Sequence, residues 1–183
     1  MSSPTSTPTL GPLTSVPALS RTDLLAPPVE SALRSFAAAH HVGVVEIDPD
    51  LADTAAMNAA YDLPVEASAN CVVVAGRRDG AERVAACVVR ADTRADVNNR
   101  VKRLLDVRKA SFLATEQAVE RSGMEYGGIT PFGLPAGWRL LIDTRVVEIE
   151  VALIGSGVRR SKLLLPGRLL AEIPGAEVVD GLA

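Results

Sequence analysis

The pattern of apolar and polar residues predicts more strands than long helices. Short apolar, β-branched segments bounded by turn residues predict strands at residues 42–47, 71–75, 83–89, 139–143, 151–154, 162–165 and 176–179. Apolar residues spaced three and four apart predict helices at residues 27–39, 49–61 and 115–122, and another that starts at residue 93. Strands joined mostly by short turns favour an α+β fold with a mixed, largely antiparallel, barrel-like sheet and flanking helices.

Several element ends carry local signals. Asp48 can cap the helix that Pro49 opens. Thr93 and Asp96 form a capping-box-like pair, and Gly123 fits the position just after the helix at 115–122. Residues 76–80 contain turn residues and predict a hairpin loop between two strands.

The first 22 residues differ in composition from the rest of the chain. They are rich in Ser, Thr and Pro and carry no charge before Arg21, so they cannot bury enough apolar surface to offset the entropy of ordering. We expect residues 1–22 to be disordered and residues 23–183 to form one domain. A chain of 183 residues is long enough for a substantial core.

Charge and cysteine content exclude several classes of protein. The net charge of −3 gives no overall attraction to nucleic acid, so binding to RNA would need a local basic patch. No apolar run approaches the ~20 residues of a membrane span, and the N-terminus lacks the features of a secretory signal. Cys71 and Cys87 fall in predicted strands and are expected to be buried, inert thiols. His40 and His41 have no second cluster of ligands, so we expect no metal site. Without a span or a secretory signal, we expect no membrane contact and a cytoplasmic location, and we expect no cofactor.

Residues 123–135, with the sequence GMEYGGITPFGLP, contain four glycines and two prolines. Glycine permits a positive φ and close approach of another molecule to the main chain, while Pro131 and Pro135 stiffen the loop. Such a loop can aim N–H groups at an anion or a carbonyl oxygen. Composition alone also fits a purely structural double turn.

A second glycine-rich turn, at residues 155–157, does not fit the common nucleotide-binding motifs. The P-loop pattern fails because Lys162 follows serine, and the dinucleotide pattern fails because Arg160 stands where its third glycine would be. The Gly-x-Ser-x-Gly turn of many hydrolases is absent as well. What remains is a tight turn beside the central loop, with Arg159, Arg160 and Lys162 contributing to a basic rim.

The segment Gly127-Gly128-Ile129-Thr130-Pro131 resembles the Gly-x-x-x-Pro loop of the YbaK/EbsC family. These proteins are aminoacyl-tRNA deacylases related to the editing domain of prolyl-tRNA synthetases. Residues 154–163 and 170–180 are similar to the second glycine-rich turn and the C-terminus of the family. The resemblance implies a trans-editing hydrolase for mischarged aminoacyl-tRNA, with tRNA for proline carrying Cys or Ala as the substrate. It implies aminoacyl-tRNA and an aminoacyl-tRNA synthetase as partners, and leaves the oligomeric state open.

The resemblance also implies which residues form the site. Residues Gly127, Gly128, Ile129, Thr130 and Pro131 would position the ester carbonyl through main-chain groups and stabilise the oxyanion, assisted by hydroxyl groups of the substrate. The family usually has a lysine where this chain has Asn70, so another cation is expected to substitute. The candidates for this and for other substrate contacts are Lys109 first and Arg159 second, then Ser111, Asp143, Gly155 and Ser156.

Two other functions remain open from the sequence. The departure at Asn70 and the negative net charge also fit an inactive family member that binds aminoacyl-tRNA or a protein partner. Hydrolysis of another small acyl ester in the same pocket is the third possibility. No Ser/His/Asp set is apparent, so any enzyme here works without an obvious protein base.

Overall fold

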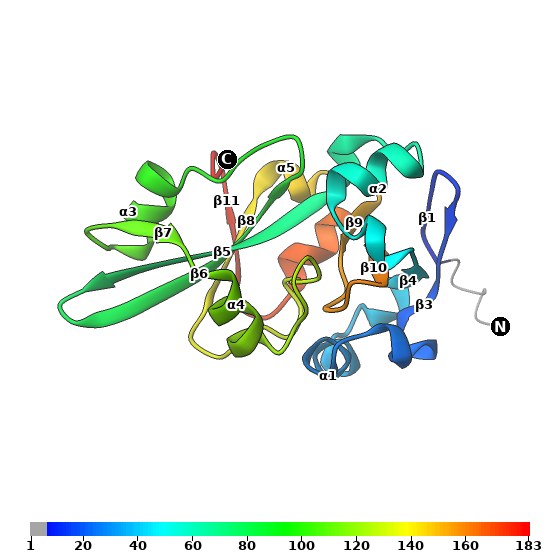
Figure 1. Ribbon diagram of the computed structural model, residues 1–183, viewed down its shortest axis with the longest axis horizontal. Helices are drawn as coiled ribbons and strands as arrows, with labels where there is room; N and C mark the ends of the chain where they lie inside the picture. Colours follow the sequence, from blue (N-terminus) through cyan, green and yellow to red (C-terminus); the bar gives the residue numbers. More distant parts are fainter. Residues whose placement is uncertain (1–6) are drawn as a thin grey trace.

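The computed structural model describes residues 7–183, which form two main β-sheets flanked by short helices (Figure 1). The larger sheet has the strand order β11-β8-β6-β5-β7, and the smaller has the order β3-β4-β10-β9. The bounds are β3 (Val16–Pro17), β4 (Gly43–Glu46), β5 (Ala69–Arg78), β6 (Ala81–Arg90), β7 (Ala110–Phe112), β8 (Arg139–Asp143), β9 (Ala152–Gly155), β10 (Ser161–Leu165) and β11 (Ala176–Val179). The β6–β8 and β8–β11 pairs are parallel and the other pairs are antiparallel. The predicted α+β class is confirmed, but within residues 7–183 neither sheet closes, so the expected barrel-like form is not found.

The helices are short and lie around the sheets. The α-helices are α1 (Pro27–Ser35), α2 (Thr54–Ala60), α3 (Lys102–Leu105), α4 (Thr115–Ser122) and α5 (Thr144–Val147). A π-helical turn at Val97–Val101 leads into α3, and 3-10 turns lie at Ala18–Ser20, Thr22–Leu24, Ala39–His41, Pro49–Leu51, Val65–Ala67 and Gly167–Glu172. Helix α4 and strands β8 and β11 have the predicted bounds, and Gly123 ends α4 in the left-handed conformation, as predicted.

Three predicted helices have different bounds because polar side chains or the core interrupt them. The predicted helix at 49–61 restarts at α2, where the Asp53 carboxylate accepts hydrogen bonds from the N–H groups of Ala55 and Ala56. The helix predicted from Thr93 begins at residue 97, because Asp96 caps it through the Asn99 N–H. Helix α1 ends at Ser35, where the chain turns to place its next aromatic side chain in the core.

Strands β5 and β6 form a hairpin that is longer than predicted. Ten residue pairs run from Ala69 opposite Arg90 to the end of the hairpin, so the turn consists of Asp79 and Gly80 alone. Both turn residues have a positive φ, 51° and 81°, which is typical of the tight turns that match the twist of two strands. Gly76, expected in the loop, lies in β5 and pairs with Arg83 and Ala110. Glycine is needed there because a Cβ would be 2.5 Å from the Lys109 carbonyl oxygen.

The N-terminal segment is ordered from residue 7 onward, so the prediction of disorder through residue 22 is wrong for that part. Strand β1 (Thr9–Leu10) pairs with β2 (Leu13–Thr14), and β3 extends the smaller sheet by pairing with β4. The Ser15 side chain occupies the space that Gly43 leaves, since a Cβ at Gly43 would be 2.0 Å from its Oγ. Pairing with an existing sheet edge supplies the hydrogen bonds that composition alone does not reveal. The part of the prediction that concerns residues 1–6 lies outside the described residues.

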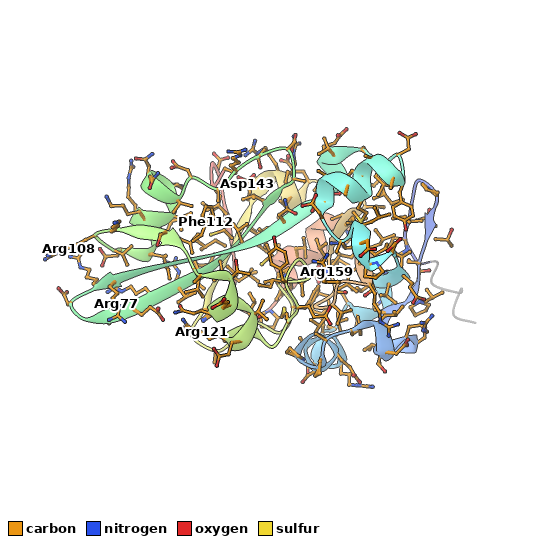
Figure 2. The ribbon with its side chains drawn as sticks, viewed as in Figure 1. Arg77, Arg108, Phe112, Arg121, Asp143 and Arg159 are labelled. Atoms are coloured by element: carbon orange, nitrogen blue, oxygen red, sulfur yellow. The ribbon has the colours of Figure 1, made fainter. Side chains whose placement is uncertain are left out.

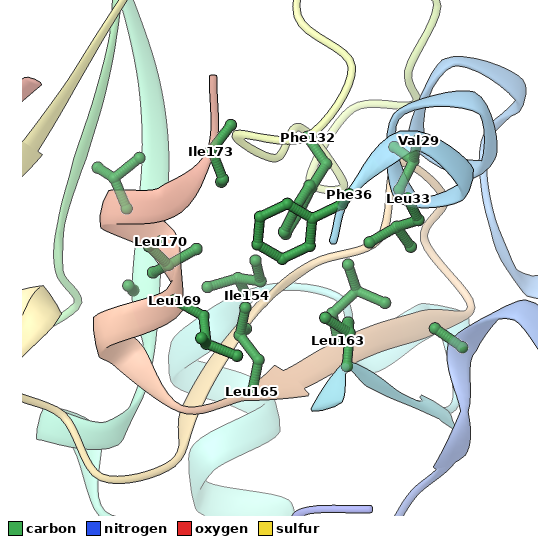
Figure 3. Packing of buried hydrophobic residues seen from close by; sticks show 14 of the residues in the cluster. Val29, Leu33, Phe36, Phe132, Ile154, Leu163, Leu165, Leu169, Leu170 and Ile173 are labelled. Carbon is green, nitrogen blue, oxygen red and sulfur yellow. The ribbon is translucent and has the colours of Figure 1, made fainter. Parts of the chain in front are cut away.

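The largest apolar cluster fills the space between the two sheets and α1 (Figure 3). Val29 and Leu33 on α1 are fully buried. The Phe36 and Phe132 rings pack edge to face, with 5.3 Å between their centroids. Phe132 belongs to the central glycine-rich stretch and is 1% exposed. This stretch is therefore anchored in the core rather than lying loosely on the surface.

Candidate functional site

The two glycine-rich turns lock together through their main chains. The Gly157 N–H donates to the Gly128 carbonyl oxygen at 2.7 Å, and the Glu125 N–H donates to the Gly157 carbonyl oxygen at 2.8 Å. A Cβ at Gly155 would be 2.5 Å from the Gly128 carbonyl oxygen, and a Cβ at Gly128 would be 2.9 Å from the Gly157 backbone. Glycine is required at both positions by this close backbone contact. The prediction of a tight turn beside the central loop is confirmed.

A cavity of about 600 Å³ lies where the two sheets separate. Strand β7 covers only residues 74–76 of β5, while Ser68 bridges to Leu153 at the start of β9. Residues 70–73 of β5 therefore form one wall at an open sheet edge, and β9, α2 and the central loop form the others. The polar or glycine residues that line it include Asp53, Thr54, Asn58, Asn70, Thr115, Tyr126, Gly127, Gly155, Arg159 and Lys162.

Lys162 is the buried cation of this cavity. Its residue is 4% exposed, and its Nζ donates to the carbonyl oxygens of Ala52 at 3.1 Å and Gly127 at 3.5 Å. No carboxylate within residues 7–183 forms a salt bridge with it. Burial, reinforced by the nearby Arg159 cation and opposed by Asp53, lowers the pKa of Lys162 from 10.5 to about 8. We predicted Lys162 as part of an exposed basic rim, and the structure places it inside the pocket instead.

Arg159, whose position is labelled in Figure 2, lines one side of the cavity. Its guanidinium donates to the carbonyl oxygens of Tyr126 and Pro49, both at 3.1 Å, and lies 5.8 Å from the centre of the Tyr126 ring. Its backbone N–H donates to the Glu125 carboxylate at 2.6 Å. Arg159 therefore joins the central loop to the turn before α2. Arg160 points away, toward Asp23 and Glu46.

Asparagine amides supply further hydrogen-bonding groups. The Asn70 Oδ1 accepts a hydrogen bond from the Thr54 hydroxyl at 2.8 Å, and this bond fixes the orientation of the Asn70 amide in the cavity wall. Asn58 is buried, its Oδ1 accepts from the Ser68 hydroxyl at 3.0 Å, and its Nδ2 has no partner within the described chain. Asn58 was not predicted as a site residue, because a single Asn within an alanine-rich helix gives no signal in the sequence.

The central loop contributes backbone donors. Gly127 and Ile129 line the cavity, and in residues 7–183 neither of their N–H groups has a protein acceptor. The Gly128 N–H is used in a turn to the Glu125 carbonyl oxygen, and the Thr130 side chain is fully buried outside the lining. Of the five predicted loop residues, Gly127 and Ile129 face the cavity, while Gly128, Thr130 and Pro131 support the loop from behind.

Four other predicted site residues lie outside the cavity lining. Lys109 and Ser111 are exposed, before and within β7. Ser156 is buried and bonds to Ser161 at 2.7 Å between their hydroxyl groups. Asp143 binds Arg145 and accepts from the last two backbone N–H groups of the chain, so it holds the C-terminus. The structure therefore brings together Asn70, Gly127, Ile129, Gly155 and Arg159 from the predicted set.

The arrangement favours binding of an electron-rich group over nucleophilic catalysis by the protein. Lys162, Arg159, Asn58, Gly127 and Ile129 all line one cavity, and within residues 7–183 the Asn58 Nδ2 and the N–H groups of Gly127 and Ile129 have no acceptor. Cys71 also lines it, but burial raises the pKa of its thiol above the usual range, so it remains protonated. A site built from donors suits the negative charge that develops on a carbonyl oxygen during ester cleavage.

The sequence profile of the aminoacyl-tRNA editing domain matches residues 48–173, which include every residue that lines this cavity. The chain belongs to this family. The resemblance to the YbaK/EbsC proteins is thereby confirmed, and aminoacyl-tRNA editing is the activity of the family. No helix within residues 7–183 has the length and apolar character to cross a membrane.

Solved structures share the fold of this editing domain. One is a candidate trans-editing enzyme for prolyl-tRNA synthetase, with 21% identity over 85% of this chain and 94% of that chain and a TM-score of 0.71. Another is a hypothetical protein, with 24% identity over 75% of this chain and 88% of that chain and a TM-score of 0.66. At these identities the likeness shows the fold alone. No curated protein sequence matches the chain.

Proposed function

We propose that this editing-domain protein acts in trans to hydrolyse the ester of a mischarged aminoacyl-tRNA, with tRNA for proline carrying Ala or Cys as the substrate. The observation that carries the proposal is the buried Lys162 ammonium, 3.5 Å from the Gly127 carbonyl oxygen, in a cavity that Gly127 and Ile129 also line with N–H groups that have no acceptor within residues 7–183. A cavity of about 600 Å³ is in the range that accommodates a terminal nucleoside and a small acyl group.

In the proposed reaction, a water oxygen adds to the ester carbonyl carbon and the bond to the ribose oxygen breaks. The loop N–H groups and Lys162 stabilise the oxyanion that forms in the first step. The proton lost by water passes to the leaving ribose oxygen through the neighbouring ribose hydroxyl, so no protein base is needed. The products are the free amino acid and the tRNA.

Lys162 takes the part expected of Lys109, because it is the lysine that lines the cavity. It reaches the site from β10, whereas Asn70 reaches it from β5. Since both side chains line the same cavity, a lysine at position 70 could supply a similar charge from the opposite wall.

The decisive experiment measures deacylation of Ala-tRNA and Cys-tRNA for proline by wild type, Gly127→Ala and Lys162→Met. We expect wild type to clear the mischarged tRNA and both variants to lose 10²-fold or more in rate, as expected for loss of an oxyanion donor. Arg168→Met, which removes an exposed cation outside both the cavity and any surface proposed to bind tRNA, is the control and keeps wild-type activity.

A double variant tests the position of the charge. Asn70→Lys in the Lys162→Met background is expected to recover part of the activity. Wild-type protein that leaves the mischarged tRNA intact, under conditions in which a known editor clears it, would falsify the hydrolase proposal.

Binding without catalysis is the second candidate function, favoured by the absence of His from the cavity lining and by the neutral Asn70. It predicts that wild type slows the spontaneous hydrolysis of a bound aminoacyl-tRNA. The same deacylation assay separates the two functions, because their effects on the rate have opposite sign.

A further inference from the structure

The charges of this protein are strongly segregated. Residues 77–83 and 102–109, which we call the basic end, hold seven Arg or Lys against three Asp or Glu, a net charge of +4. The rest of the chain holds twelve Arg or Lys against nineteen Asp or Glu, a net charge of −7. The overall value of −3 therefore hides one basic region on an acidic protein.

The fold brings the two segments of the basic end together. The β5–β6 hairpin turn supplies one segment, and α3 with the approach to β7 supplies the other. Arg78 and Arg83 both contact the single carboxylate of Asp106, at 2.7 and 2.8 Å. Figure 2 shows Arg77 and Arg108 at this extremity of the molecule.

Much of the positive charge is not neutralised. Arg78 and Arg83 are paired with Asp106, and Arg78 also lies 3.8 Å from Asp79, so the unpaired charge comes from the other cations of the basic end. Arg77, Arg103, Arg108 and Lys109 are exposed, and no salt bridge joins any of them to a carboxylate of residues 7–183. Exposed cations left without carboxylates on an acidic protein favour a negatively charged partner.

The basic end leads to the cavity along β7. Lys109 precedes this strand and Phe112 ends it, so about 10 Å of extended chain separates the cations from the cavity wall. Phe112 lines the cavity and yet is 61% exposed, which is unusual for a phenylalanine. An exposed aromatic ring between a basic surface and a donor-lined cavity matches the stacking platforms that bind unpaired bases.

The geometry points to the basic end as the surface that binds the phosphate backbone of the RNA acceptor arm, with Phe112 stacking on an unpaired base next to the 3′ end. This inference rests on the proposed function for the direction of the RNA, and names the part of the protein that holds the tRNA body. The acidic remainder of the molecule repels RNA, which orients the bound tRNA with its 3′ end at the cavity.

Equilibrium binding of uncharged tRNA tests the surface without requiring any reaction. The probe is labelled tRNA for proline, titrated at several salt concentrations with full-length wild type, with Arg108→Ser/Lys109→Ser, and with Arg34→Ser/Arg168→Ser. The last variant removes two exposed arginines away from the basic end and changes the net charge by the same amount. We expect the slope of log affinity against log salt to fall by about 1.5 in the first variant only.

A third variant, Phe112→Ser, is expected to weaken binding of the tRNA at least fivefold and to leave the salt slope unchanged, because stacking involves no phosphate. Equal losses in both double variants would overturn the inference, since net charge rather than position would then control binding. Unchanged binding of tRNA by Arg108→Ser/Lys109→Ser would overturn it too.

The proposed function and this inference can fail separately. Salt-dependent binding through the basic end without deacylation would reject the hydrolase and keep the surface. Deacylation by Arg108→Ser/Lys109→Ser with wild-type affinity for tRNA would reject the surface and keep the hydrolase.

Discussion

Replacing Lys162 by methionine should reveal how much stability the protein gives up to keep a charge in the cavity. Burial, and then the neighbouring Arg159, lower the pKa of Lys162 from 10.5 to about 8. At neutral pH the folded protein holds this ammonium in an unfavourable environment that the unfolded chain lacks. The difference between the two pKa values corresponds to about 3 kcal/mol.

The lowered pKa of Lys162 changes the free energy of unfolding over a defined range of pH. Below pH 8 lysine 162 is protonated in both states, and its destabilising contribution is complete. As the pH rises from about 8 to 10.5, the unfolded chain still binds the proton while the folded protein has released it, so wild type becomes more stable. Lys162→Met has no amino group at this position, so it lacks this dependence on pH. Its stability advantage over wild type should therefore shrink by about 2.5 kcal/mol between pH 7 and pH 10.

Urea unfolding followed by the fluorescence of the single tryptophan, Trp138, measures this difference at pH 7, 8, 9 and 10. The change with pH is the readout, because loss of the hydrogen bonds to Ala52 and Gly127 offsets the absolute gain by about 1 kcal/mol each. Gly175→Ala, which removes no ionisable group, is the control, and its difference from wild type should not change with pH. A difference for Lys162→Met that is independent of pH would show that the amino group is not held in a costly environment.

Three further results are expected. Gly155→Ala should abolish activity, because its Cβ would be 2.5 Å from a carbonyl oxygen of the central loop, whereas Gly80→Ala, with nothing within 4 Å, should lower stability and leave activity intact. The thiols of Cys71 and Cys87 should react slowly with iodoacetamide at pH 8 until urea unfolds the protein, because burial raises the pKa of both, that of Cys87 to about 12. Removal of residues 1–17 should lower the urea midpoint, since it deletes β3 from the smaller sheet; an unchanged midpoint would contradict the structural role of this segment.

Local patterns predicted the elements whose ends carry their own signals. Helix α4 runs from Thr115 to Ser122 as expected, because Gly123 ends it through a backbone conformation that glycine adopts readily. Strands β8 and β11 are apolar and bounded by turn residues, and their limits were also predicted correctly. The hairpin turn was placed too early, because Gly76 reads as a turn residue until the contact with the Lys109 backbone is known.

The parts of the site formed by the main chain were predicted from the sequence. The side chains that reach the cavity through the packing of distant strands were not. The central loop and Gly155 were identified from glycine content and resemblance, and they do meet in the structure. Lys162 was placed on a basic rim because its neighbours in sequence, Arg159 and Arg160, are charged and polar. Strand alternation against β9 and β4 turns its side chain inward, and that requires the register of a sheet assembled from distant segments.

The close main-chain contacts between Gly128, Gly155 and Gly157 hold the central loop, whereas other residues of the cavity wall determine the space available to the acyl group. The central loop is held by these main-chain contacts together with Arg159, Lys162 and Phe132, so its position does not depend on the other side chains of the cavity wall. Substitutions at wall positions such as Thr54 or Ala118 change the shape and polarity available to the acyl group and leave the loop in place. Selectivity can therefore diverge rapidly on this scaffold while the reactive centre stays unchanged, and the three glycines are the positions at which such change is least tolerated.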